Sequence, residues 1–148
     1  MTRSVQEVGL LIKRLQHRHH RALTAVLADL GISLVQWDTL RHLDGNPDAS
    51  LHDLAQLTFQ TDQSFGSLAT RMAERGLIER VPGPGRAVRH RLTERGQRLR
   101  KAGEDLVGQV LADSFAPLSV EQRDQLAELL HLLLDVPAGP DADDATAD

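Results

Sequence analysis

The chain has 148 residues, 41% hydrophobic and 26% charged and with no cysteine, which suits one globular domain and excludes disulfides and thiolate chemistry. No apolar run approaches the roughly 18 residues of a membrane helix and no leader is visible, so we expect a soluble cytoplasmic protein. The net charge of −4 is uneven: residues 51–101 carry ten Lys/Arg against five Asp/Glu, and residues 102–148 carry one arginine against eleven acids.

Two helices are predicted before residue 46. Apolar residues recur at helical spacing over residues 5–30 and predict one long helix that Gly31 ends. Ser33 and Gln36 have the spacing of a capping box and predict the start of a second helix. The sequence Gly-Asn-Pro at 45–47 ends it.

The middle of the chain predicts a winged helix-turn-helix. Ser50 is expected to cap a short third helix, and a break at residues 59–61 separates it from a fourth that ends at Gly76. Two helices joined by a short turn, the second polar on its outer face, describe a helix-turn-helix over about 50–76. Two β-compatible segments flank Pro82–Gly85 and predict a hairpin, the wing, over about 77–92.

Two more helices follow the wing. Thr93 begins the fifth, with an apolar stripe expected at Leu99, Ala102, Leu106 and Val110. Ser119 and Gln122 open the sixth, whose segment LAELLHLLL is too apolar for the surface of a monomer.

The predicted fold class is mainly α with a small β-hairpin. Residues 1–30 and 98–136 are expected to form dimerisation helices that bury their excess apolar surface against a second copy of the chain. Residues 31–97 form the winged helix-turn-helix lobe, and residues 137–148 form a disordered acidic tail.

From about residue 5 to 135 the sequence resembles the MarR family of bacterial transcriptional regulators. The resemblance rests on RMAERGLIER at the end of the fourth helix, and on Arg86 followed by Leu92-Thr93 and Gly96. The family's wing carries an aspartate where this chain has Pro84, which puts the local support of Arg86 in question. The resemblance implies a homodimer that binds palindromic operator DNA, and repression as the default role. Many family members release DNA when a small molecule binds between the dimer base and the DNA-binding lobes.

The fourth helix is expected to read DNA, since the first turns of a recognition helix face base edges in the major groove. The wing-tip Arg86 is expected to enter the minor groove, with Arg89 and Arg91 on the flanking backbone. Asp62 is expected to cap the helix, because phosphate repels a carboxylate. The alternative is that these side chains are solvated or capping groups and the wing is unengaged. The predicted DNA-contacting residues are Gln60, Thr61, Gln63, Ser64, Ser67, Arg71, Arg86, Arg89 and Arg91.

An effector pocket is predicted beside the second helix, which borders that pocket in MarR-like folds. A small aromatic or carboxylate ligand would suit a tryptophan next to an arginine and imidazoles. The predicted lining is His17, His20, Trp37, Leu40 and Arg41. His17 and His20 are spaced to share a metal, but no carboxylate motif accompanies them, so neither a metal nor another cofactor is expected.

Other classes of function have weaker support. The chain has no GxSxG elbow, phosphate loop or thiol nucleophile, so no catalytic residues are expected and the protein is not predicted to be an enzyme. A winged-helix ligand sensor or protein-interaction module with weak or no DNA binding is the alternative, with Pro84 as its main support. The basic excess of residues 51–101 favours DNA. The prediction is a sequence-specific homodimer on half-sites about one helical turn apart, most simply a ligand-responsive repressor.

Overall fold

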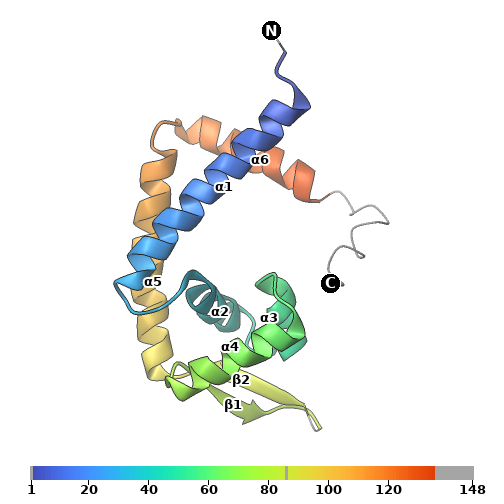
Figure 1. The fold of residues 1–148 in the computed structure, drawn as a ribbon, viewed down its shortest axis with the longest axis vertical. Coiled ribbons are helices and arrows are strands. Elements are labelled where there is room, and N and C mark those ends of the chain that lie inside the picture. Colours follow the sequence, from blue (N-terminus) through green and yellow to red (C-terminus); the bar gives the residue numbers. More distant parts are fainter. Residues whose placement is uncertain (1, 86, 136–148) are drawn as a thin grey trace. The chain divides into compact units, whose positions relative to one another are not determined.

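A computed structural model of the chain describes residues 2–85 and 87–135, within which it holds six helices and one two-stranded antiparallel hairpin (Figure 1). The predicted wing-tip Arg86 and the predicted tail 137–148 lie outside the described residues. The chain divides into two compact units, Met1–Leu111 and Ala112–Asp148. Among the described residues, no helix combines the length and apolar character that a membrane span requires.

Four helices precede the wing, and a hydroxyl side chain caps each of them. The hydroxyls of Ser4, Ser33, Ser50 and Thr61 each accept a hydrogen bond from the backbone N–H three residues on. The predicted capping box at the second helix is confirmed, since the Gln36 side chain also accepts from the Ser33 N–H at 3.0 Å. The helices are α1 (Val5–Ala28), α2 (Leu34–Gly45), α3 (Leu51–Leu57) and α4 (Asp62–Glu74).

Glycines end two of these helices as predicted. Gly31 follows α1 with a φ of 74° and Gly76 follows α4 with a φ of 72°, a region that L side chains adopt only at a cost. Both positions therefore turn the chain sharply out of its helix.

The wing pairs β1 (Ile78–Pro82) with β2 (Val88–Leu92), with Ile78 opposite Leu92. Thr93 joins the wing to α5 (Glu94–Phe115): its hydroxyl donates to the Gly76 carbonyl at 2.5 Å and accepts from the Gly96 N–H at 3.0 Å. Gly96 is required here, because a Cβ at this position would lie 2.0 Å from the Leu77 carbonyl oxygen. The Leu-Thr-x-x-Gly motif therefore fixes the start of α5 against the base of the wing.

The core of the first unit lies where α1, α2, α3, α4 and the base of the wing meet. Its largest fully buried side chains come from all of these elements and are Leu27, Leu40, Leu54, Phe65, Met72 and Leu77. Burial of this apolar surface is the main stabilising contribution to the lobe.

The buried face of α5 differs from the predicted stripe. Gly103 and Val107 are buried, whereas Ala102, Leu106 and Val110 are only partly covered. A Cβ on Gly103 would lie 2.3 Å from Cδ1 of Trp37, so α5 approaches α2 at a point where only glycine fits. The prediction followed apolar side chains and therefore placed the contact face about one residue away from the true one.

Apolar side chains remain exposed on the terminal helices of the single chain. In the first unit they cover the N-terminal half of α1, at Val5, Val8, Leu10, Leu11 and Ile12. In the second unit, α6 (Val120–Leu134) starts at the predicted Ser119–Gln122 capping box. Its exposed apolar residues are Val120, Leu129, Leu130, Leu132, Leu133 and Leu134.

Candidate nucleic-acid interface

The N-terminal turns of α4 form a polar surface on a firmly packed helix. The Thr61 hydroxyl accepts from the Ser64 N–H at 3.1 Å and starts the helix, while Phe65 and Met72 are fully buried on its inner face. The side chains of Gln63, Ser64 and Ser67 are exposed on the outer face, and Gln60 is half-buried in the preceding turn. The inner face therefore fixes the direction in which these hydrogen-bonding groups point.

Asp62 has a different role from the predicted one. Thr61 caps α4, and Asp62 occupies the first turn with its Oδ1 atom 2.8 Å from Nδ1 of His52 on α3. An acidic residue in the first turn of a helix is favourable next to the unpaired backbone N–H groups. The pair also ties the two helices of the helix-turn-helix together at their exposed side.

The arginines at the end of α4 have separate positions. Arg71 is exposed, as a phosphate contact would require. Arg75 instead donates to the Gly31 carbonyl at 2.7 Å and to the Gln36 side chain at 3.1 Å. It therefore anchors the end of α4 to the turn between α1 and α2.

The wing holds its cations in different ways. Arg91 donates to Glu79 on the facing strand at 2.5 Å, so part of its charge is already neutralised. Arg89 is half-buried, and its guanidinium donates weakly to the Val88 carbonyl at 3.3 Å. Gly85, in the turn of the wing, has a φ of 62°, a conformation that would be strained for a residue with a side chain.

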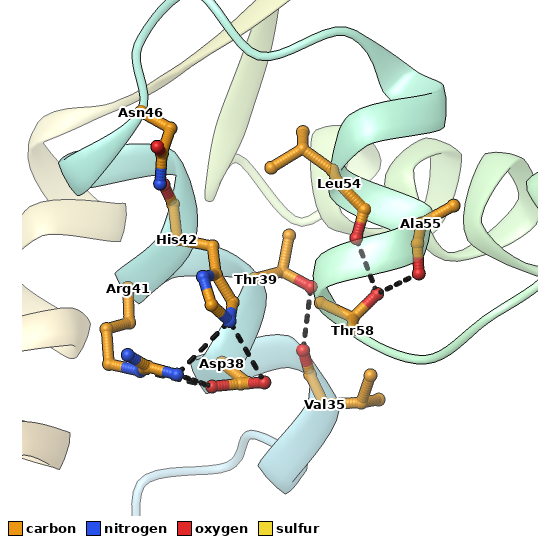
Figure 2. A network of polar contacts seen from close by, with 9 residues as sticks. All are labelled: Val35, Asp38, Thr39, Arg41, His42, Asn46, Leu54, Ala55 and Thr58. Carbon is orange, nitrogen blue, oxygen red and sulfur yellow. Dashed lines mark hydrogen bonds and ion pairs between the residues drawn. The ribbon is translucent and has the colours of Figure 1, made fainter. Parts of the chain in front are cut away.

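The five residues of the predicted effector pocket lie in different surroundings. Leu40 is fully buried and Trp37 nearly so, and both belong to the core. Arg41 stacks over the Trp37 ring at 5.8 Å. Figure 2 shows the Arg41 guanidinium bonded to the Asp38 carboxylate, where Nη2 donates at 2.6 Å.

The two histidines of that prediction lie on α1. His20 is exposed, and so is His17, which lines a cavity of about 790 Å³ along the helix. The same cavity is lined by four cations, Lys13, Arg14, Arg18 and Arg21. Within the described residues, no group of three or more His, Asp or Glu is placed to hold a metal ion.

Sequence reasoning missed three residues around this interface. Phe59, in the turn between α3 and α4, has a φ of 57° and is 96% exposed. The partners of His52 and the burial of His90 were also missed, because both depend on contacts between elements distant in sequence. The break at 59–61 marked a turn without indicating its backbone conformation, and the alternation over residues 88–92 placed His90 on the side of Val88 and Leu92 without indicating its burial.

Known proteins resemble this chain in both sequence and fold. Residues 30–87 match the sequence model of the MarR family. The HTH-type transcriptional repressor Rv2887 of Mycobacterium tuberculosis is 27% identical over 128 residues, which are 85% of this chain and 92% of that protein.

Solved structures share the fold over most of the chain. Rv2887 in complex with p-aminosalicylic acid has a TM-score of 0.71 at 27% identity, covering 84% of this chain and 96% of that one. A mutant MarR from E. coli in complex with operator DNA has a TM-score of 0.77 at 24% identity, covering 88% and 94%. A complex of S. aureus MepR with DNA has a TM-score of 0.75 at 20% identity, covering 84% and 92%.

Proposed function

We propose that this chain is a DNA-binding transcriptional repressor of the MarR family, because residues 30–87 match the model of that family and the chain shares the fold of MarR structures over most of its length. The observation that carries the proposal is the capped N-terminus of α4, which presents Gln63, Ser64 and Ser67 on the outer face of a helix whose inner face is buried. These groups suit base edges or phosphates in a major groove. The protein would act where the DNA lies, in the cytoplasm.

The repressor works as a homodimer on a palindromic operator. A symmetric dimer presents two copies of α4, which read half-sites about one helical turn apart. The exposed apolar residues of α1 and α6 supply surface for the second copy. Gel filtration with light scattering tests this step, and a mass of one chain at micromolar concentration would contradict it.

The wing supplies charge and the helix supplies sequence preference. The Arg86→Ala variant should bind DNA more weakly on all sequences, and should reduce the slope of log affinity against log salt by about one for each phosphate that the arginine neutralises. The Gln63→Ala variant should instead change which bases are preferred at one position of each half-site. Both are measured by fluorescence anisotropy on an operator selected from random duplexes.

The controls separate this function from its alternative. Arg3→Ala changes a cation that pairs with Glu7 at the start of α1 and should leave both readouts unchanged. If the wild-type protein selects no duplex, the alternative function, a winged-helix ligand sensor or protein-interaction module, is favoured. If Arg86→Ala keeps full affinity at physiological salt, the role of the wing is wrong.

An aromatic carboxylate is the proposed effector. The solved relative Rv2887 binds p-aminosalicylic acid and salicylic acid, and the cavity on α1 combines four cations with His17 and the apolar Leu10. A guanidinium pairs well with a carboxylate, and the apolar wall suits a ring. Titration calorimetry with salicylate should show binding that Arg18→Ala weakens and Arg98→Ala, a surface change on α5, does not. Equal affinity for all three proteins would contradict this site.

A further inference from the structure

A second cavity lies inside the DNA-binding lobe, between α4 and the wing. Its volume is about 420 Å³, within the range of small-molecule sites. Its lining includes Ala69, Thr70, Ala73 and Glu74 from α4, Leu51 from α3, and Arg80, Val88 and His90 from the wing. None of these residues lines the cavity along α1, so the two cavities are separate.

His90 makes this cavity unusual. The residue is only 5% exposed, and its Nδ1 atom has no hydrogen-bond partner in the described part of the chain. Buried polar atoms in folded proteins nearly always have a partner. Burial and the nearby Arg80 lower the pKa of His90, so the ring is neutral, with one nitrogen that donates and one that accepts.

The remaining lining defines the kind of molecule that fits. Ala69, Ala73 and Val88 form an apolar wall, which favours a hydrocarbon body. Glu74 and Arg80 carry opposite charges, so the cavity has no net preference for an anion or a cation. A hydroxyl group both donates and accepts, and therefore suits the neutral imidazole ring of His90 in either tautomer.

We propose that this cavity is a binding site for a small uncharged alcohol with an apolar body, whose hydroxyl group hydrogen-bonds to the imidazole ring of His90. Such a ligand contacts both elements that face DNA, because α4 carries Gln63 and β2 carries Arg89. Its binding would fix the spacing between the recognition helix and the wing. This consequence for DNA rests on the proposed function, whereas binding itself does not.

The test uses two probes of nearly equal size in the absence of DNA. Benzyl alcohol carries the hydroxyl group and toluene lacks it. Titration of each into the full chain is followed by the NMR signals of the histidine rings. Benzyl alcohol should shift the His90 signal saturably, and should bind about 5- to 10-fold more tightly than toluene, the gain expected from one hydrogen bond.

Two variants separate this site from general surface binding. Ala73→Leu places a larger side chain on the cavity wall and should abolish the saturable shift, whereas Ala25→Leu on the exposed side of α1 should leave it unchanged. His90→Phe keeps the volume but removes the polar atom, so its affinities for the two probes, followed by the Val88 methyl signals, should become equal.

Three results would overturn the proposal. These are the absence of a saturable shift at His90, an unchanged shift in Ala73→Leu, and a preference for benzyl alcohol that persists in His90→Phe. A parallel measurement of DNA affinity with and without benzyl alcohol tests only the consequence for DNA. If the wild-type protein binds the probe but no DNA, the proposed function fails while the site stands.

Discussion

At Phe59 the backbone adopts a conformation that its side chain does not favour. A φ of 57° belongs to the left-handed region, where a bulky L residue is strained, and the exposed ring gains little burial in return. The backbone N–H of Phe59 nevertheless bonds to the Gln56 carbonyl at 3.2 Å, which holds the turn between α3 and α4. The turn of the helix-turn-helix is therefore stable despite this residue.

Replacing Phe59 by asparagine should stabilise the protein. Asparagine tolerates the left-handed region, so Phe59→Asn should raise the free energy of unfolding by up to about 1 kcal/mol. Urea denaturation measures the change. Leucine does not tolerate the left-handed region, so Phe59→Leu should not raise the free energy of unfolding. A loss of stability in Phe59→Asn would mean that the ring makes a stabilising contact.

His90 should make stability depend on pH. Burial and Arg80 lower its pKa below the ordinary value of 6.5, so on acidification the unfolded chain takes up a proton before the folded chain does. The free energy of unfolding should therefore fall as the pH drops through 6.5 toward the folded pKa. More than about one pH unit above 6.5 the ring is neutral in both states and contributes no pH dependence.

Two variants isolate that contribution. His90→Phe should flatten the decrease in stability between pH 7.5 and 5.5, measured by urea denaturation at each pH. Arg80→Gln removes one cause of the lowered pKa and should reduce the decrease without abolishing it. A decrease of the same size in His90→Phe would assign the pH dependence to other groups.

At the scale of elements, the contact between α2 and α5 depends on one missing side chain. Trp37 lies against Gly103, and its indole N–H donates to the Arg100 carbonyl at 3.1 Å. Gly103→Ala should cost on the order of 1–3 kcal/mol by overpacking, despite the better helix propensity of alanine. Thermal unfolding compares it with Gly108→Ala on the same helix, where a Cβ meets nothing within 4 Å and stability should rise by up to about 1 kcal/mol. If both variants behave alike, the close approach is not important for stability.

The elements were predictable to the extent that local signals define them. The cap at Ser33 and the glycine at Gly76 depend on neighbouring residues alone, and both were found from the sequence. The contact of Gly103 with Trp37 joins residues 66 positions apart, and no periodicity reports it. The pairing of Arg91 with Glu79 was not predicted either, because it depends on the register between the two strands of the wing.

At the scale of the whole molecule, the exposed leucines of α6 predict how assembly can be broken. Leu133 is 64% exposed in the single chain, and in a symmetric dimer that covers it each substitution acts twice, once in either copy. At about 2 kcal/mol for each buried leucine, Leu133→Ala should raise the dimer dissociation constant by about 10³-fold. Analytical ultracentrifugation measures this, with Gln125→Ala on the same helix as the control. An unchanged constant would show that α6 lies outside the interface at this position.

The missing side chain at Gly103 also limits how the protein can move. The edge of the Trp37 ring packs against the backbone of α5 at Gly103. If α5 slid along α2, the ring would collide with side chains of the neighbouring turns of α5. This contact therefore opposes a sliding motion between α2 and α5. In the proposed response to an effector, α2 and this part of α5 are therefore expected to move together.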